Sequence, residues 1–444
     1  MTSRTVRVVS ATGVALVLFV AGALGPLRSD SSSGAQPNNF PGAGSLLAPT
    51  AAAGDLDDAI ASLQQRLRNE PEDARSLSTL GLAYLQKARI STDPSFYSKS
   101  EAVLSRSLEI DPSGNFEAMI GLGALDLARH DFAGALKWGR RARDFNPHNA
   151  QVRGILGDAY LELGRYDEAG DAFQDMIDLR PDLSSYARVS YARELRGDVP
   201  GAVTAMKLAR SAAGNATDEA WTHYQLGELF FNSGRYRKAR AAYNHGAWLD
   251  PGSVLPRVGL ARIAGARGEV GRAIRLLERV TRRQPFTEYV VLLGDLLGAA
   301  GRTTEAEAQY ELAAAIAELY RSNGVNVDLE QSLFDADHGR PGRALRVARA
   351  EYERRRSVHV ADALAWALYA NGDYEAAARY SNEALRLGTR SALFRFHAGM
   401  IAMKLGARAE AVGHLSAALE INPHFSFLHA PVATRTLAEL KAAR

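Results

Sequence analysis

A repeat of about 34 residues is the feature that most constrains what this chain can fold into. Five prolines recur at spacings of 35, 34, 70 and 34 residues, and the spacing of 70 equals two units; they are Pro112, Pro147, Pro181, Pro251 and Pro285. A unit of this length cannot bury its apolar faces alone, so neighbouring units must stack along one axis. The period therefore predicts an extended solenoid rather than several compact domains.

Composition sets the limits on chemistry. The 444 residues are 46% apolar and 23% charged, which is enough apolar material for a large core. There is no cysteine, which excludes disulfides, thiolate nucleophiles, iron–sulfur clusters and thiolate zinc sites. Any metal ion would need histidine and carboxylate ligands. The net charge of only +3 gives no reason to expect nucleic acid as a partner.

Within one unit the pattern predicts two helices that face each other. Gly164 stands between them as a helix C-cap, and Pro181 ends the second helix because a helix cannot readily continue through proline. Apolar residues at helical spacing line the facing sides: Leu156, Gly157 and Tyr160 on the first helix, and Ala169, Phe173 and Met176 on the second. Each unit is thus expected to be a helical hairpin.

Two segments show the pattern most clearly: GILGDAYLELGRYDEAGDAFQDMIDLRPD, residues 154–182, and HYQLGELFFNSGRYRKARAAYNHGAWLDP, residues 223–251. They resemble the tetratricopeptide repeat family over residues 55–444. The resemblance implies an all-α fold, a right-handed superhelical solenoid of helical hairpins. Its register assigns repeat packing to Gly123, Ala135, Gly157, Tyr160, Ala169, Phe173, Gly227, Ala239, Tyr243, Gly294, Gly399 and Ala411.

The register predicts about ten hairpins. They are expected near residues 72–112, 115–148, 149–182, 183–216, 220–253, 254–287, 288–322, 326–357, 358–390 and 392–424, with a lone helix near 55–69 before them and a capping helix at 431–443 after them. The first unit is about seven residues longer than the others, and we expect the excess in its inter-helix loop, near Ser91–Ser98. The unit at 326–357 is degenerate.

The N-terminus has the pattern of an export signal. Arg4 and Arg7 precede an uncharged run of 18 residues, Val8–Gly25. We expect residues 1–28 to form a signal peptide or a signal-anchor helix. Ala21-Gly22-Ala23 offers a cleavage site, while the run is nearly long enough to span a bilayer, so cleavage and anchoring both remain open. Residues 29–54 read as a flexible low-complexity linker, and the repeats are expected outside the cytoplasm.

No catalytic grouping is predicted. A nucleophilic triad, a phosphate-binding glycine loop or an adjacent carboxylate pair can be assembled only by ignoring the repeat register, which already explains most of the glycines. The array also leaves no segment long enough for a catalytic domain. We therefore expect no enzyme activity, no catalytic residue and no cofactor.

The concave face is the candidate binding surface, because the resemblance implies that first helices of successive units line the inside of the superhelix and hold a peptide there. Register places a candidate ligand groove at Asp158, Tyr224, Glu228, Phe231, Asn232, Arg262, Asp295, Trp366, Tyr369, Phe396 and Met400. Aromatic and amide side chains in such a groove can hold a ligand by stacking and hydrogen bonding. The alternative is that several of them only seal the interfaces between units.

Histidines and arginines suggest two further hypotheses. His397, His424 and His429 could meet at one edge of the array and bind a metal ion, or they could be capping and loop residues. Two arginine stripes at helical spacing read as solvated outer faces, or as surfaces for anionic polymers and lipid headgroups: Arg272, Arg275, Arg279, Arg282 and Arg283, and Arg343, Arg346, Arg349 and Arg354–Arg356.

These observations favour an exported or membrane-anchored scaffold that binds a protein or peptide ligand in its concave groove. The membrane is a second partner if the N-terminal segment is not cleaved, and no nucleic-acid partner is expected. Two alternatives remain: an envelope protein that binds metal or an anionic polymer, and an accessory subunit of a membrane transporter or assembly complex. The same fold serves all three, so fold alone does not decide between them.

Overall fold

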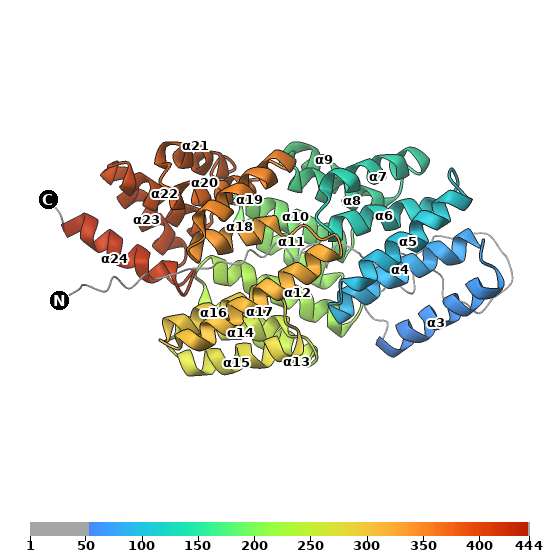
Figure 1. The fold of residues 1–444 in the computed structure, drawn as a ribbon, viewed down its shortest axis with the longest axis horizontal. Helices are drawn as coiled ribbons and strands as arrows, with labels where there is room; N and C mark the ends of the chain where they lie inside the picture. The colour runs from blue at the N-terminus through green and yellow to red at the C-terminus, as the bar shows by residue number, and fades with distance from the viewer. Residues whose placement is uncertain (1–52, 443–444) are drawn as a thin grey trace.

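The computed structural model describes residues 53–442, and all of its regular elements in that range are α-helices (Figure 1). The predicted signal segment and almost all of the predicted linker lie outside this range. None of the helices described has the length and apolarity needed to cross a bilayer.

Twenty of the helices pair into ten hairpins. The first five are α4–α5 (Ala74–Ser91, Ser95–Ile110), α6–α7 (Phe116–Ala128, Phe132–Phe145), α8–α9 (Ala150–Glu162, Tyr166–Leu179), α10–α11 (Leu183–Leu195, Val199–Ser211) and α12–α13 (Ala216–Asn232, Tyr236–Leu249). The last five are α14–α15 (Leu255–Ala266, Val270–Arg283), α16–α17 (Thr287–Ala299, Thr303–Ser322), α18–α19 (Asp328–Asp337, Pro341–Arg354), α20–α21 (Val358–Ala370, Tyr374–Ala384) and α22–α23 (Ala392–Lys404, Arg408–Ile421).

A single helix stands at each end of the array, α3 (Ala53–Asn69) before the first hairpin and α24 (His429–Ala442) after the last. Each helix of a hairpin packs on its partner, and successive hairpins pack on one another except at α16–α17 and α18–α19, where the contact is limited to side chains such as Tyr310 and Phe334. The predicted all-α solenoid of about ten hairpins with a C-terminal capping helix is confirmed.

Four hairpins close where a glycine on the first helix meets a bulky side chain of the second. A Cβ atom would come within 2.2–2.8 Å of a side chain sixteen positions later at four glycines: Gly157 against Phe173, Gly227 against Tyr243, Gly294 against Tyr310, and Gly399 against Leu415. The other predicted packing residues lie nearby: Ala135, Ala169, Ala239 and Ala411 are at most 1% exposed, Gly123 faces Ile155, and Tyr160 is half-buried. Close packing of this kind explains why the small residues recur in register.

The expected long loop in the first unit is wrong. The extra residues lengthen the helices, so that α4 has 18 residues and α5 has 16, and only residues 92–94 connect them. Residues 82–91 contain neither glycine nor proline, and nothing in them stops the helix. Pro94 is accepted because it stands at the start of α5, where its missing N–H costs no helical hydrogen bond.

Turns of the first half of the chain contact turns of the second half, about 190 residues away in sequence. We call these contacts the seam: residues 129–130, 162–166, 195–197 and 231–236 on one side, and residues 326, 351–358, 388–389 and 421–422 on the other. The Asn326 N–H donates to the Arg129 carbonyl oxygen (2.9 Å), the Val358 N–H to the Tyr166 hydroxyl (2.7 Å), the Thr389 hydroxyl to the Leu195 carbonyl oxygen, and the Asn422 amide to the Phe231 carbonyl oxygen (2.9 Å).

Two of the seam turns have no room for a side chain. Gly164 and Gly197 have φ of 79° and 75°, and a Cβ atom there would lie 2.3 Å from the Arg356 carbonyl oxygen and 2.4 Å from the Gly388 carbonyl oxygen. Outside the seam, Gly372 has an equivalent turn with φ of 84° but no described atom within 4 Å of such a Cβ. Glycine in the seam therefore meets two demands, a left-handed backbone and a close approach of another backbone.

The seam folds the array back on itself. In Figure 1 the orange α19 lies beside the teal α9, although nearly 200 residues separate them in sequence. The hairpins after α17 thus pack against the hairpins from α6 to α13 instead of extending away from them.

Alanine substitutions at the turn glycines test the seam. We expect Gly372→Ala and Gly406→Ala to cost about 1–2 kcal/mol each, the usual cost of a side chain in the left-handed region. Gly164→Ala and Gly197→Ala must also displace a backbone carbonyl, so they should lower the free energy of unfolding by clearly more. Urea unfolding followed by circular dichroism measures the difference, and equal losses in the two pairs would contradict the close contact.

Candidate functional site

The predicted groove residues do lie on first helices, but most of them are closed off from solvent. Seven of the eleven are buried, with at most 8% of their surface exposed: Tyr224, Glu228, Phe231, Asp295, Trp366, Phe396 and Met400. Asp158, Asn232, Arg262 and Tyr369 keep partial exposure. The expectation of an open aromatic groove at these positions is therefore wrong for the seven buried residues.

Trp366 shows why the aromatic residues are not free to stack on a ligand. Its ring stacks on Tyr369 and His397, with ring centroids 4.6 Å and 4.1 Å away, and its indole N–H donates to Asp337 Oδ1 (2.6 Å). Phe396 and Met400 belong to the same apolar cluster, which α24 helps to cover. These side chains stabilise the packing between units, as the alternative interpretation predicted.

Tyr224, Phe231 and Asp295 have similar roles. Tyr224 and Phe231 pack in a cluster with Tyr243, and Asp295 accepts a hydrogen bond from the Tyr310 hydroxyl (3.0 Å). His338 Nε2 lies 3.5 Å from the same Asp295 carboxylate.

Polar side chains dominate what remains accessible on the inner side of the first helices. Arg188 donates to both oxygens of Asp158 (2.9 and 2.8 Å), which joins α10 to α8. Arg262 donates to Glu228 (2.6 Å), which joins α14 to α12, and the Tyr243 hydroxyl donates to the same carboxylate (2.5 Å). Since Arg262 also lies over the Phe231 ring at 4.1 Å, it is held on two sides.

Four further carboxylates lie on this inner face and escaped the sequence analysis: Glu162 on α8, Glu194 on α10, Glu288 on α16 and Glu330 on α18. Burial raises the pKa of Glu162 and of Glu194 to about 7, and that of Glu288 to about 8. The negative charge of Glu330 further raises the pKa of both Glu162 and Glu288. The three carboxylates therefore lie near one another on the inner face. We call Glu162, Glu194, Glu228, Glu288 and Glu330 the inner carboxylates.

The repeat register could have found one of them. Glu162 stands 70 residues, or two units, before Asn232, which was recognised as an inner position. Glu288 and Glu330 lie in the first turns of their helices, where the repeat places no inward residue, and no motif marks them. They become neighbours only through the curvature of the array.

Arg355 corrects the interpretation of the second arginine stripe. It was expected on a solvated face but is only 3% exposed, and its guanidinium donates to Glu162 (2.6 Å) across the seam and to Glu351. The Arg355 Cζ atom lies 4.7 Å from the centroid of the Phe132 ring, which covers the guanidinium on another side. A buried arginine between two carboxylates is costly to disrupt, because either partner left alone would be a buried, unpaired charge.

Some polar groups of the inner face have no hydrogen-bond partner among the residues that the structure describes. Among the described residues, Glu288 makes no hydrogen bond or ion pair, and Glu330 Oε1 is buried without one. The Tyr289 hydroxyl, on a side chain 1% exposed, is also unsatisfied within the described range. Buried polar groups are normally hydrogen-bonded, and Glu288, which is only half-buried, can receive a donor from outside the chain.

The predicted histidine site does not assemble. His397 Nδ1 lies 2.9 Å from Asp362 and its ring meets that of His429, with centroids 5.8 Å apart, but His424 packs on Tyr236 at the seam. The three imidazoles do not converge, and within residues 53–442 the histidine and carboxylate group with metal-binding geometry lies elsewhere.

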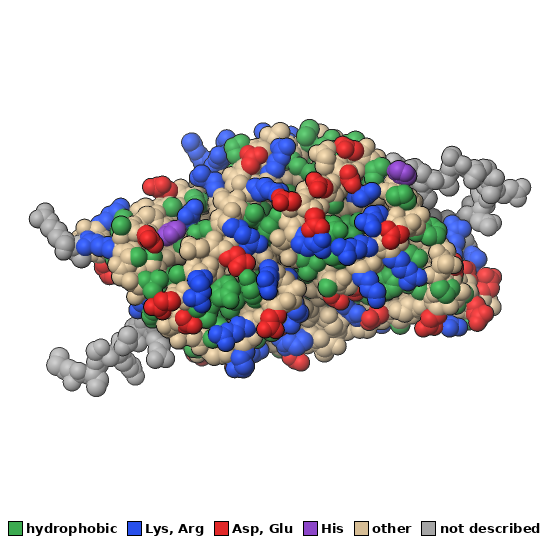
Figure 2. All heavy atoms as spheres, turned by 90° about the horizontal axis from the view of Figure 1, so that it is seen from above, with side chains coloured by type: hydrophobic (Ala, Val, Ile, Leu, Met, Phe, Trp, Pro, Cys, Tyr) green, Lys and Arg blue, Asp and Glu red, His purple; other side chains and the backbone are tan. Residues whose placement is uncertain are grey.

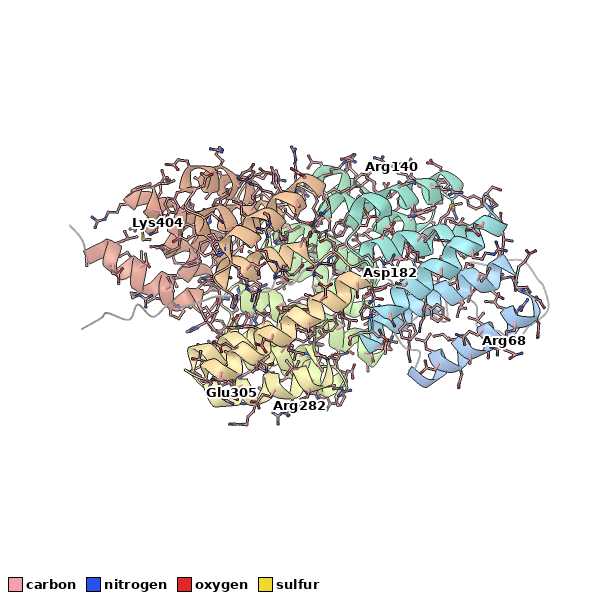
Figure 3. All side chains as sticks on the ribbon, viewed as in Figure 1. Arg68, Arg140, Asp182, Arg282, Glu305 and Lys404 are labelled. Atoms are coloured by element: carbon pink, nitrogen blue, oxygen red, sulfur yellow. The ribbon has the colours of Figure 1, made fainter. Side chains whose placement is uncertain are left out.

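The first arginine stripe is on the outside. Its five arginines are all exposed, and Figure 3 shows Arg282 at the outer edge of α15. An acidic residue accompanies the stripe, since Arg272 pairs with Glu269 (2.9 Å). On the opposite side of the molecule, the face drawn in Figure 2, positive and negative side chains are also interspersed. Mixed charge is typical of a solvated surface and does not favour an anionic polymer as partner.

Comparisons with known proteins agree on the repeat. Family models described as tetratricopeptide repeat match residues 51–99, 126–191, 222–252, 258–321 and 363–424, which together make up more than half of the chain. Anaphase-promoting complex subunit 7 from Arabidopsis thaliana is 25% identical over 283 residues, covering 62% of this chain and 48% of that protein. The chain thus spans about half the length of this relative.

Similar solved structures include the Cut9–Hcn1 hetero-tetramer of the anaphase-promoting complex, with 13% identity, 87% of each chain covered and a TM-score of 0.42. Yeast Tom70 is 15% identical, with 88% of this chain and 86% of that chain covered and a TM-score of 0.38. A repeat protein from Parabacteroides merdae is 17% identical, with 57% and 96% covered and a TM-score of 0.40.

Glu288 provides a pH test of the inner face. Its pKa is raised from 4.5 to about 8, so the folded protein binds the proton more tightly than the unfolded chain does. The resulting stability is fully present below about pH 4.5 and is lost as the pH rises through 8. The free energy of unfolding of Glu288→Gln, relative to the parent, should therefore increase between pH 5 and pH 9. Glu307→Gln, on the exposed side of α17, is the control, and parallel pH profiles for parent and Glu288→Gln would contradict the assignment.

Proposed function

Because the chain belongs to the tetratricopeptide repeat family, we propose that it is a non-enzymatic interaction scaffold whose inner face binds a basic segment of a partner protein. The observation that carries this proposal is the set of inner carboxylates, which outnumbers the arginines facing it. Three buried or half-buried arginines are already engaged: Arg188 with Asp158, Arg262 with Glu228, and Arg355 with Glu162 and Glu351.

The unpartnered groups define the chemistry of the ligand. Within residues 53–442, Glu288 and the Oε1 atom of Glu330 have no hydrogen-bond donor, so a lysine or arginine side chain supplies what they lack. A charge-assisted hydrogen bond contributes roughly 1.5–3 kcal/mol. A partner's cation also favours the ionised carboxylates, which burial alone disfavours. Ligand binding and proton release are therefore coupled at this face.

Recognition by charge replaces the aromatic stacking that the groove residues suggested. The aromatic rings of Trp366, Phe396 and Phe231 are committed to packing and have at most 7% of their surface exposed. The inner carboxylates of the protein and the backbone of the ligand are then the main determinants of binding. Because electrostatic recognition is screened by ions, binding should weaken as salt increases.

Export is part of the proposal. Arg4 and Arg7 ahead of the apolar run Val8–Gly25 support delivery of the repeats across a membrane, after which the segment is either removed or kept as an anchor. Expression of the full chain, cell fractionation and N-terminal sequencing decide between these outcomes. Recovery of the intact chain in the cytosolic fraction would reject export.

Peptide binding tests the function directly. Fluorescence anisotropy should show that labelled lysine- and arginine-rich peptides bind and that glutamate-rich peptides of the same length do not. A Glu288→Gln, Glu330→Gln variant should lose tenfold or more in affinity, since about 1.4 kcal/mol corresponds to a factor of ten. Affinity of the parent should also rise between pH 6 and pH 9 as the carboxylates ionise.

Glu307→Gln, Glu311→Gln is the matched control, because it removes two exposed carboxylates from α17 without touching the inner face. Crosslinking and affinity capture should be done with the parent, the control and the Glu288→Gln, Glu330→Gln variant. The parent and the control should capture the same partners, and the variant should capture fewer of them. Equal binding of acidic and basic peptides, or an unchanged partner set, would contradict the proposal.

A further inference from the structure

Helix α12 and helix α13 bring three metal-ligating side chains together away from the inner carboxylates. Glu219 and His223 are four residues apart on α12, and His245 comes from α13. One ligand atom from each lies within 4.8 Å of the other two. His223 Nε2 is 3.8 Å from Glu219 Oε1, and the two imidazole centroids are 4.3 Å apart.

The local fold builds this arrangement in two ways. The first helix of this hairpin is 17 residues long where α8 has 13, and its first turn, capped by the Asn215 side chain, carries Glu219 onto the same face as His223. Gly246 allows α13 to come close, since a Cβ atom there would lie 3.0 Å from the Ala220 carbonyl oxygen. His245, next to it, is thereby placed opposite His223.

The ligand set suits a divalent transition metal ion. Two imidazoles and one carboxylate are the ligands of many zinc sites, with a fourth position left for water. Burial lowers the pKa of His223, and the neighbouring His245 and Arg210 act in the same direction, while Glu219 opposes them. The neutral imidazole is the form that binds a metal. The charge of Arg210 would oppose the ion, and that of Glu219 offsets it.

The position is open to solvent on one side. His245 is exposed, and Trp248, with 72% of its surface exposed, has its ring centroid 5.5 Å from that of His245. An ion can therefore reach the three ligands without unfolding the hairpin. The indole also gives a reporter next to the site.

We propose that Glu219, His223 and His245 bind a zinc ion or a related divalent transition metal ion, which links α12 to α13. The ion joins the two helices of a hairpin whose turn, at Phe231 and Tyr236, is part of the seam. Binding to the folded form alone then stabilises this hairpin. This site is independent of the proposed peptide-binding face and of the histidines near the C-terminus.

Titration of the metal-free, tag-free full chain tests the proposal. Isothermal titration calorimetry with zinc chloride should give one site per chain, and copper(II) should quench Trp248 fluorescence at the same stoichiometry. His245→Ala, an exposed position where folding is safe, should weaken zinc binding at least tenfold and abolish the quenching. Affinity should fall from pH 7.5 to pH 5.5, because protons compete with the metal ion for its ligands.

His148→Ala is the control, because it removes another exposed histidine, one that lies outside the metal-ligating group. Its zinc affinity should equal that of the parent. Glu219→Gln keeps the size of the side chain and should weaken binding without loss of helical circular dichroism. The proposal is overturned if the parent binds no zinc, or if His245→Ala and His148→Ala bind it with the parent's affinity.

Discussion

The buried ion pair between Arg355 and Glu162, together with the turns that meet around it, is the constraint on which the rest of the structure depends. Arg355 follows α19 and Glu162 ends α8, so the pair ties hairpins that are 193 residues apart in sequence. Glu351 and Asn326 complete the cluster from the same side as Arg355. Without this closure the first helices would face open solvent, and burial would no longer raise the pKa of Glu162, Glu194 and Glu288.

Packing between units and closure of the array together shape the inner face. Packing between neighbouring units buries the aromatic residues of the first helices, as Trp366 of α20 shows with its hydrogen bond to Asp337 of α18. Closure brings Glu162, Glu288 and Glu330 within electrostatic reach of one another from three helices. A face that is acidic, partly enclosed and incompletely hydrogen-bonded is suited to a cationic segment, and this is the link between the fold and the proposed scaffold function.

Sequence reasoning predicted the part of the structure that repeats. The glycine and the bulky residue sixteen positions later recur from unit to unit, so hairpins, their order and the capping helix follow from local pattern. The seam does not repeat in this sense, because it depends on small rotations summed over several units. That is why Arg355 was taken for a surface residue, and why Glu288 and Glu330 were missed. The extended α4 was missed for another reason: length in excess of the repeat was assigned to a loop, although no residue there ends a helix.

The most direct test of the closed array is a distance across the seam. The chain has no cysteine, so spin labels on Arg193→Cys and Arg390→Cys, two exposed positions beside the Gly197–Gly388 contact, report that distance alone. Double electron–electron resonance should give one narrow distribution at the separation seen in the structure, as narrow as that of a control pair, Arg193→Cys with Lys207→Cys, within one hairpin. A broad distribution or a much longer distance across the seam, with the control pair unchanged, would contradict the account.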